Sequence, residues 1–447
     1  MARCISEKRL NFLCSSVNRA VSFTRPTYMT MTRKRQGRDW DPVNMVGTFS
    51  YETLFSEDST DTPLNPVAHA KYDFAVAYPA PETLPMDGLI QALQTAVDSN
   101  SEKVLAEMAY YPQQLGALEL REYTVEKLKA DRGFTVTPEE IALTNGSGEA
   151  LGLVIQALTN PGDVVLAEEF VYMGTTNQLR RFGADIRGVA IDDGGIITEA
   201  LDKQITELTA AGEKPKYLYT IPEHQNPTGS TLSGERRKAI LEIAHKHGMP
   251  ILEDDCYVDL RYKGEVQPAF RALDDSGIVV YVASYSKLLA PGLRLGYFTC
   301  SPDLMRRALS FKIGSGPNQF AAVAIEGFLK NNLDSHRDNF NPMLKAKCNS
   351  MVAALEEQFG DSGATWSVPE GGCYVWLTMP EGADIASIRD EVFEQGVGYV
   401  AGPNFEADAS GRIGQNCARL CFAFESVEKN AEGIALLAQL FKQHGVM

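Results

Sequence analysis

The chain has 447 residues, of which 44% are apolar and 22% are charged, and its formal net charge is −16. This length is sufficient for two domains with substantial cores, and the composition is ordinary for a globular protein. The negative charge argues against nucleic acid as the main partner, and no stretch approaches the roughly 20 apolar residues of a membrane-spanning helix, so we predict no nucleic-acid and no membrane partner.

Residues 1–45 are predicted to be a basic segment that is disordered or acts as a transit peptide. Residues 1–38 contain nine Lys or Arg residues and one acid, Glu7, together with several Ser and Thr residues. A segment rich in Arg and hydroxyl groups and poor in acids is typical of organelle transit peptides, which would place the protein in the mitochondrion or another organelle. A disordered basic tail, or a later start methionine, is the alternative and would leave the protein in the cytoplasm.

Residues 46–100 are predicted to form an N-terminal arm and part of a small domain, and residues 101–333 a large domain. In the large domain, short apolar runs alternate with longer amphipathic stretches. The expected strands are residues 141–144, 164–167, 186–191, 217–221, 250–253 and 278–283, and the expected helices include 150–158 and 234–247. Continuous apolar strands that alternate with helices predict a mostly parallel sheet with helices on both faces.

Residues 334–447 are predicted to form a smaller α+β domain. The expected elements are a long helix over about residues 341–359, strands at 373–377 and 419–424, and a last helix at 426–444. Ser426 is a residue type that caps helix N-termini, which favours a helix start at this point.

The cysteines and histidines give no metal-binding pattern. None of the eight cysteines forms a Cys-x-x-Cys pair, and the six histidines form no His-Glu-x-x-His motif. We therefore predict reduced thiols and no structural metal.

Lys287 is the first candidate for chemistry, because it closely follows the apolar run 278–283. Burying a bare ammonium is costly, and desolvation lowers the pKa of a lysine and frees its amine as a nucleophile. Ser284, Ser286 and Arg294 nearby are the groups that bind a phosphate. An amine beside a phosphate site indicates pyridoxal 5'-phosphate (PLP) held as a Schiff base.

Three further motifs follow strands of the same predicted sheet, and ligands in such sheets bind at the carboxyl ends of the strands. The small residues of 145–148 join a strand to a helix, so that backbone N–H groups can face an anion. One carboxylate of 253–255 can pair with a protonated pyridine nitrogen. In the turn 226–229, Asn226 can donate a hydrogen bond to the phenolate oxygen of the cofactor.

Taken in order, these motifs resemble those of the fold-type I PLP-dependent aminotransferases of class I and II, over about residues 72–443. The pattern is most similar to the branch that contains the kynurenine and α-aminoadipate aminotransferases. The resemblance implies an α/β fold with a mostly parallel seven-stranded sheet in the large domain and a smaller α+β domain. It also implies PLP as the cofactor and a homodimer with active sites at the interface.

The resemblance assigns a role to each matching residue. Lys287 would be the Schiff-base lysine, Asp254 the partner of the pyridine nitrogen, and Arg419 the two-pronged anchor of the substrate α-carboxylate. The other cofactor contacts implied are Asn226 and Tyr257 at the phenolate oxygen, Ser147, the backbone of Gly148, Ser284, Ser286 and Arg294 at the phosphate, Tyr172 stacked on the ring, and Tyr111 reaching the phosphate of the neighbouring subunit. The alternatives are core packing for Tyr172, a surface charge for Arg419, and Tyr110 in place of Tyr111.

The predicted function is transfer of an amino group from an L-amino acid to a 2-oxo acid by a ping-pong mechanism. Lys287, Asp254 and Tyr257 would be catalytic, and Arg419, Asn226 and Tyr78 would bind substrate.

The chain departs from the branch at three positions. Tyr78 stands where the branch usually has glycine, Gly148 where many members have glutamine, and Cys256 where many have proline. These changes leave the substrate open, and another PLP reaction on the same scaffold, such as a lyase, oxidase or condensation reaction, is the alternative function. A non-catalytic aminotransferase-like regulator is a further alternative, although residues 1–71 show no helix-turn-helix pattern.

Overall fold

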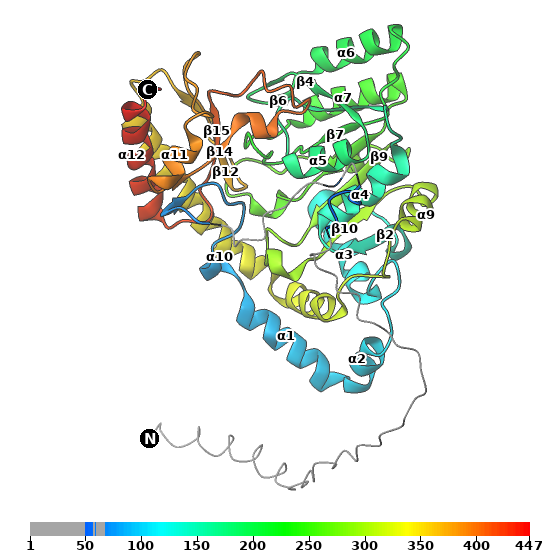
Figure 1. Cartoon of the computed structure of the whole chain (residues 1–447). Helices are drawn as coiled ribbons and strands as arrows, with labels where there is room; N and C mark the ends of the chain where they lie inside the picture. Colours follow the sequence, from blue (N-terminus) through cyan, green and yellow to red (C-terminus); the bar gives the residue numbers. More distant parts are fainter. Residues whose placement is uncertain (1–49, 57–58, 60–67) are drawn as a thin grey trace, which may run out of the picture. The chain divides into compact units, whose positions relative to one another are not determined.

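The computed structural model describes residues 50–56, 59 and 68–447. The chain divides into two units, Met1–Thr62 and Pro63–Met447, and the fold below is that of the second unit (Figure 1). The predicted basic segment 1–45 lies outside the described residues, so the transit-peptide hypothesis and the cellular location stay predictions.

A seven-stranded sheet forms the centre of this unit, with the strand order β2-β10-β9-β8-β7-β3-β4. The strands are β2 (Ile141–Thr144), β3 (Val164–Glu168), β4 (Asp185–Val189), β7 (Leu218–Thr220), β8 (Ile251–Asp254), β9 (Val279–Ser284) and β10 (Gly296–Thr299). All neighbours pair in parallel except β10, which runs antiparallel to β2 and β9. The mostly parallel seven-stranded sheet is thus confirmed. The sequence did not predict β10, whose four residues include only two large apolar side chains.

Helices cover both faces of the sheet, because its strands are apolar on both sides (Figure 1). In β9, Val280 and Val282 belong to the core on one face, whereas Val279 and Tyr281 belong to the cores on the other. The first face is covered by α4 (Ser147–Leu158), α5 (Met173–Arg181) and α9 (Pro302–Ser310), and the second by α3 (Leu118–Arg132), α6 (Thr198–Ala210), α7 (Gly234–His247) and α8 (Phe270–Leu273).

A second, four-stranded antiparallel sheet lies in the C-terminal part, with the order β11-β12-β15-β14. Its strands are β11 (Thr365–Trp366), β12 (Tyr374–Thr378), β15 (Cys417–Cys421) and β14 (Val400–Ala401). The last helix, α12 (Val427–Gln443), begins after Ser426, whose hydroxyl accepts a hydrogen bond from Lys429 N at 3.2 Å, as the sequence predicted for a capping serine. The remaining elements are α1 (Met86–Ser99), α2 (Ser101–Met108), α11 (Arg389–Glu394), the pair β5 (Ile191–Asp192) and β6 (Gly195–Ile196), and the pair β1 (Tyr72–Asp73) and β13 (Val397–Gly398).

The longest helix, α10 (Gln319–Phe359), begins 22 residues before the predicted start at residue 341. Proline is favoured only in the first turn of a helix, so Pro342 makes residue 341 look like a helix start. The structural start is instead set by Asn318, whose side chain accepts a hydrogen bond from Ala321 N at 3.0 Å. Helix α10 runs through residue 333, where the boundary between the large and the small domain was predicted. That domain boundary and the one predicted at residue 100 stay predictions.

Candidate active site

The predicted site residues gather where the parallel strands end. Asp254 is the last residue of β8, Ser284 is the last of β9, and Ser147 is the first of α4, which follows β2. Lys287 and Asn226 lie a few residues beyond the ends of β9 and β7. This edge is where an open α/β sheet binds its ligands, because the loops there are free to diverge.

Lys287 is held by the segment that precedes α1. Its Nζ donates a hydrogen bond to the carbonyl of Ala77 at 2.5 Å and lies 5.8 Å from the ring centroid of Tyr78. Burial lowers the pKa of Lys287 below its usual value of 10.5, and Arg419 lowers it further, against the opposing effect of nearby thiols. A lowered pKa leaves more of the amine uncharged at neutral pH, as a nucleophile or a general base requires.

Asp254 is a buried carboxylate with uncharged donors on both oxygens. Tyr219 Oη donates to Oδ2 at 3.0 Å, and Cys256 Sγ donates to Oδ1 at 2.8 Å. Burial raises the pKa of Asp254 to about 6, and Lys287 lowers it less than either hydrogen bond does. A cation placed directly beside this carboxylate would lower the pKa again, so the site fits a protonated ring nitrogen.

Asn226 and Arg419 are joined in one hydrogen-bonded network. The amide Nδ2 of Asn226 donates to the hydroxyl of Tyr257 at 3.3 Å, and Arg419 Nη1 donates to Oδ1 of the same amide at 3.2 Å. The Tyr257 hydroxyl is also 3.2 Å from the hydroxyl of Tyr374. The guanidinium lies 4.5 Å from the ring of Tyr374 and 5.2 Å from that of Phe405. The two aromatic rings fix the plane of the guanidinium by cation–π contacts.

Arg419 is nearly inaccessible and is not the surface charge of the alternative reading. Its side chain is 2% exposed, and its Nη2 donates to the carbonyls of Ala75 at 2.7 Å and Val76 at 3.4 Å. Its Nε is buried without a hydrogen-bond partner. The segment of residues 75–78 therefore contacts both Arg419 and Lys287. A substrate carboxylate would accept hydrogen bonds from the Arg419 guanidinium that backbone carbonyls of this segment now accept.

The N-terminus of α4 has the shape of an anion cradle. Gly146 (φ +83°) and Arg294 (φ +52°) both adopt the left-handed conformation, and Arg294 Nη2 donates to the carbonyl of Asn145 at 2.9 Å. A Cβ on Gly146 would lie less than 3.0 Å from that guanidinium, so only glycine allows Arg294 to lie across this turn. The Oγ of Ser284 accepts from Ser286 N at 3.1 Å. The guanidinium of Arg294 and the backbone N–H groups at the N-terminus of α4 are donors that fit a phosphate group.

Three tyrosines complete the comparison with the predicted residues. Tyr172 precedes α5, and its pKa is raised by burial and then by the negative charge of Asp254. Tyr78, which is 48% exposed, lies beside Lys287. Tyr111 is 89% exposed and lines a cavity that contains none of the other predicted site residues.

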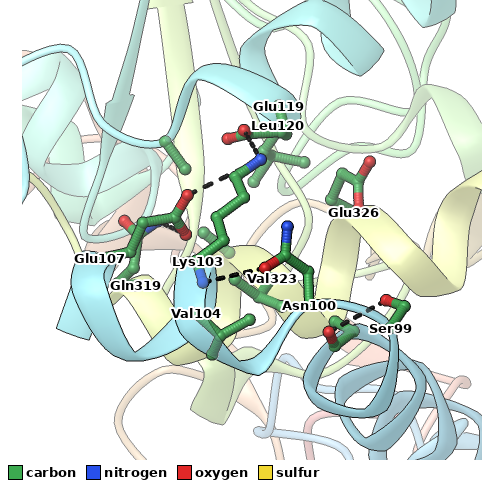
Figure 2. Close-up of a pocket in the computed structure, with 13 residues that line it drawn as sticks. Ser99, Asn100, Lys103, Val104, Glu107, Glu119, Leu120, Gln319, Val323 and Glu326 are labelled. Atoms are coloured by element: carbon green, nitrogen blue, oxygen red, sulfur yellow. Dashed lines mark hydrogen bonds and ion pairs between the residues drawn. The ribbon is translucent and has the colours of Figure 1, made fainter.

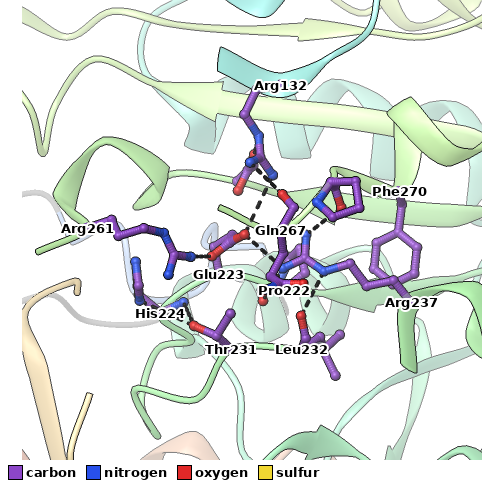
Figure 3. A network of polar contacts seen from close by, with 12 residues as sticks. Arg132, Pro222, Glu223, His224, Thr231, Leu232, Arg237, Arg261, Gln267 and Phe270 are labelled. Carbon is purple, nitrogen blue, oxygen red and sulfur yellow. Dashed lines mark hydrogen bonds and ion pairs between the residues drawn. The ribbon is translucent and has the colours of Figure 1, made fainter. Parts of the chain in front are cut away.

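A buried ion network supports the loop that carries Asn226 (Figure 3). Glu223 is fully buried and pairs with Arg237 at 2.9 Å and with Arg261 and Arg132. Arg237 also donates to the carbonyls of Pro222 and Leu232, both at 2.9 Å. These bonds fasten the start of the loop to α7. This network was not predictable from the sequence, because Glu223 and its three arginines come from separate segments.

Another cavity, of about 210 Å³, lies among α2, α3 and α10 (Figure 2). Lys103 is surrounded there by Glu107, Glu119 and Glu326, and none of the predicted site residues lines the cavity.

Over the described ranges, no group of His, Cys, Asp and Glu has an arrangement that could hold a metal ion, and the six described cysteines are unpaired. None of the described helices is both long and apolar enough to cross a membrane.

The family model for aminotransferase class I and II matches residues 81–437. The chain belongs to this aminotransferase family. It is 32% identical over 407 residues to aromatic-amino-acid aminotransferase 1 of Thermococcus litoralis, covering 89% of this chain and 96% of the relative.

Solved structures give the same result for the fold of the aminotransferase. The multiple substrate aminotransferase of Thermococcus profundus superimposes with a TM-score of 0.82 at 28% identity, covering 89% of this chain and 99% of the other. The kynurenine aminotransferase of Pyrococcus horikoshii, solved in complex with PMP, has a TM-score of 0.80 at 30% identity and covers 88% and 98% of the two chains. The predicted fold-type I architecture is confirmed.

The candidate site also contains residues that were not predicted from the sequence. Tyr219 and Cys256 hydrogen-bond Asp254, and Tyr374 contacts both Tyr257 and Arg419. Tyr219 and Tyr374 lie within strands and look like core residues in the sequence. Only Cys256 was singled out in the sequence, as a departure from the pattern of the branch that the motifs resemble.

Proposed function

We propose that this aminotransferase binds PLP at the edge of the seven-stranded sheet and moves an amino group from an L-amino acid to a 2-oxo acid by a ping-pong mechanism. The observation that carries the proposal is the convergence of Lys287, Asp254 and Arg419. An amine of lowered pKa, a buried carboxylate without a directly paired cation and a buried guanidinium meet in one site. When bound, PLP supplies an electron-accepting ring that stabilises negative charge on the α-carbon of the substrate.

Each end of the site holds one part of the cofactor. Arg294 and the first turn of α4 bind the phosphate, together with the hydroxyls of Ser147, Ser284 and Ser286. Asp254 would hold the proton on the ring nitrogen, and Tyr172 would pack against the ring. Asn226 Nδ2 and the Tyr257 hydroxyl, which are 3.3 Å apart, would both donate to the ring oxygen.

The substrate is oriented by Arg419 and deprotonated by Lys287. Arg419 binds the α-carboxylate through two parallel hydrogen bonds, because its planar guanidinium is already fixed between Tyr374 and Phe405. The uncharged amine of Lys287 would take the proton from the substrate α-carbon as general base and deliver it to the cofactor carbon as general acid. The carbonyls of residues 75–77 now accept the hydrogen bonds of both Arg419 and Lys287.

We propose aromatic L-amino acids as the preferred donors. The ring of Tyr78 lies 5.8 Å from Lys287 Nζ and is 48% exposed, so one face is free to stack on an aromatic side chain. A relative that is 32% identical is named an aromatic-amino-acid aminotransferase.

A homodimer is also proposed, with Tyr111 contacting the cofactor phosphate of the neighbouring subunit. The exposure of Tyr111, at 89%, supports a role outside its own site. Light scattering should give a mass close to twice 49.0 kDa. Substitution of Tyr111→Phe should weaken PLP binding; a monomer that binds PLP as tightly with either residue would contradict this arrangement.

The proposed function is tested with Lys287→Ala and Lys287→Arg. Both variants should retain the fold but lose the visible absorbance of lysine-bound PLP and the half-reaction with phenylalanine, since neither has a nucleophilic amine. Turnover that requires a 2-oxo acid separates transamination from elimination, which releases ammonia without an acceptor. Full half-reaction turnover by either variant would overturn the proposal.

A further inference from the structure

The thiol of Cys256 lies at the end of the candidate site where the ring nitrogen would bind. Its Sγ donates to Oδ1 of Asp254 at 2.8 Å, while the Tyr219 hydroxyl donates to Oδ2 at 3.0 Å. Asp254 is 4% exposed and Tyr219 is fully buried, so bulk water does not compete for the carboxylate. Both carboxylate oxygens thus have a protein donor, and neither donor is charged.

We propose that Cys256 is a positioning residue that orients the Asp254 carboxylate and reduces its basicity toward the ring nitrogen of bound PLP. The inference rests on the proposed function. A hydrogen bond to the ionised form favours that form. A thiol is a weak donor, so it orients the carboxylate but leaves most of its charge to the ring nitrogen, whereas Lys or Arg would neutralise it.

The thiol remains a donor near neutral pH. Burial raises the pKa of Cys256 well above its usual range, and Asp254 raises it further, against a hydrogen bond with Ser147 that lowers it. Ser147 is the first residue of α4, in the proposed phosphate cradle. The pKa of Cys256 is therefore influenced both from the phosphate end of the site and by the carboxylate at the ring nitrogen.

Other ionisable groups also act on Asp254, and they define the controls. They come from every neighbouring strand end: Glu168 of β3, Tyr219 of β7, Asp255 and Cys256 after β8, Lys287 after β9, and Tyr172 before α5. Asp255 raises the pKa of Asp254 and Lys287 lowers it, and both remain in the variants below.

The hydrogen bond itself can be observed in cofactor-free protein by infrared spectroscopy of the S–H stretching band. Cys256→Ala should remove a band at lowered frequency, because a strong acceptor weakens the S–H bond. Asp254→Asn should shift that band toward the frequency of a weakly bonded thiol. The proposal would be overturned if the Cys256 band had the same frequency as the bands of the other thiols and if Asp254→Asn did not shift it.

The effect on the ring nitrogen is measured by NMR of protein loaded with ¹⁵N-labelled PLP. In Cys256→Ala, the pH midpoint of the nitrogen signal should rise by about 0.5 to 1 pH unit, as expected for losing one hydrogen bond. Cys256→Ser should stay near the wild type, and Cys300→Ala, which removes a buried thiol outside the site, should not move the midpoint. If Asp254→Ala alters the signal and Cys256→Ala does not, this inference fails; if Asp254→Ala also leaves it unchanged, the proposed function fails.

Discussion

Arg419 and Asn226 share a hydrogen bond of 3.2 Å, donated by Nη1 of the guanidinium to Oδ1 of the amide. The same amide donates to Tyr257 through Nδ2 at 3.3 Å. The proposed substrate anchor is therefore coupled to the pair that would hold the ring oxygen. A carboxylate bound to Arg419 would therefore act directly on the amide that is proposed to orient the cofactor.

Arg419→Lys should raise the KM for the amino donor by about 10- to 100-fold, because a lysine keeps the charge but loses the two-pronged geometry. The dissociation constant of PLP should change much less, since the phosphate and ring-nitrogen contacts remain. Steady-state kinetics at saturating 2-oxo acid measure the effect. An unchanged KM would show that the α-carboxylate binds elsewhere.

Tyr78→Ala should reduce the preference for aromatic donors. Loss of one stacking contact predicts a fall of about 2- to 12-fold in the ratio of kcat/KM for phenylalanine to that for alanine. Tyr78→Phe keeps the ring and should keep the ratio. A ratio that stays constant, or rises, in Tyr78→Ala would place the substrate side chain away from this ring.

The lowered pKa of Lys287 predicts how cofactor-free protein takes up PLP as the pH changes. Only the uncharged amine reacts, so a pKa below the usual 10.5 moves the rise in rate to a lower pH than for an ordinary lysine. Stopped-flow absorbance should place the midpoint clearly below 10.5. Lys287→Ala should show only slow uptake by surface lysines, and a wild-type midpoint at the ordinary value would contradict the desolvated environment.

Most of the fold was predictable because the strands of the large sheet are continuous apolar runs. The boundaries of β2 were predicted without error, and those of β8 and β9 within one residue. The start of α10 was missed because Pro342 obscured a helix that Asn318 caps.

The site was predictable where short motifs carry the chemistry, as at Lys287, Asp254 and Asn226. Contacts between distant segments were not. Nothing in the sequence around Tyr219 indicates that it reaches Asp254, and nothing near residue 75 indicates that its carbonyl faces Arg419. The first contact joins the neighbouring strands β7 and β8, and the second joins β15 to the segment before α1. Sequence periodicity specifies neither contact.

The buried network around Glu223 should contribute strongly to stability (Figure 3). Arg237→Ala leaves a fully buried carboxylate without one of its three guanidinium partners, and we expect a loss of about 3–5 kcal/mol in unfolding free energy. Arg236→Ala is the matched control, because its partner Asp192 is solvent-exposed and such pairs contribute about 0–1 kcal/mol. Urea unfolding curves compare the two variants; equal midpoints would mean that the buried network is not what holds the Asn226 loop.

The role of Lys287 is tested most directly by reducing the PLP-loaded protein with borohydride and mapping the modified peptide by mass spectrometry. Reduction converts the link between lysine and cofactor into a stable secondary amine. We expect a phosphopyridoxyl group on Lys287, at a stoichiometry near one per chain, and its absence in Lys287→Arg. Modification of a different lysine, or none at Lys287, would contradict it.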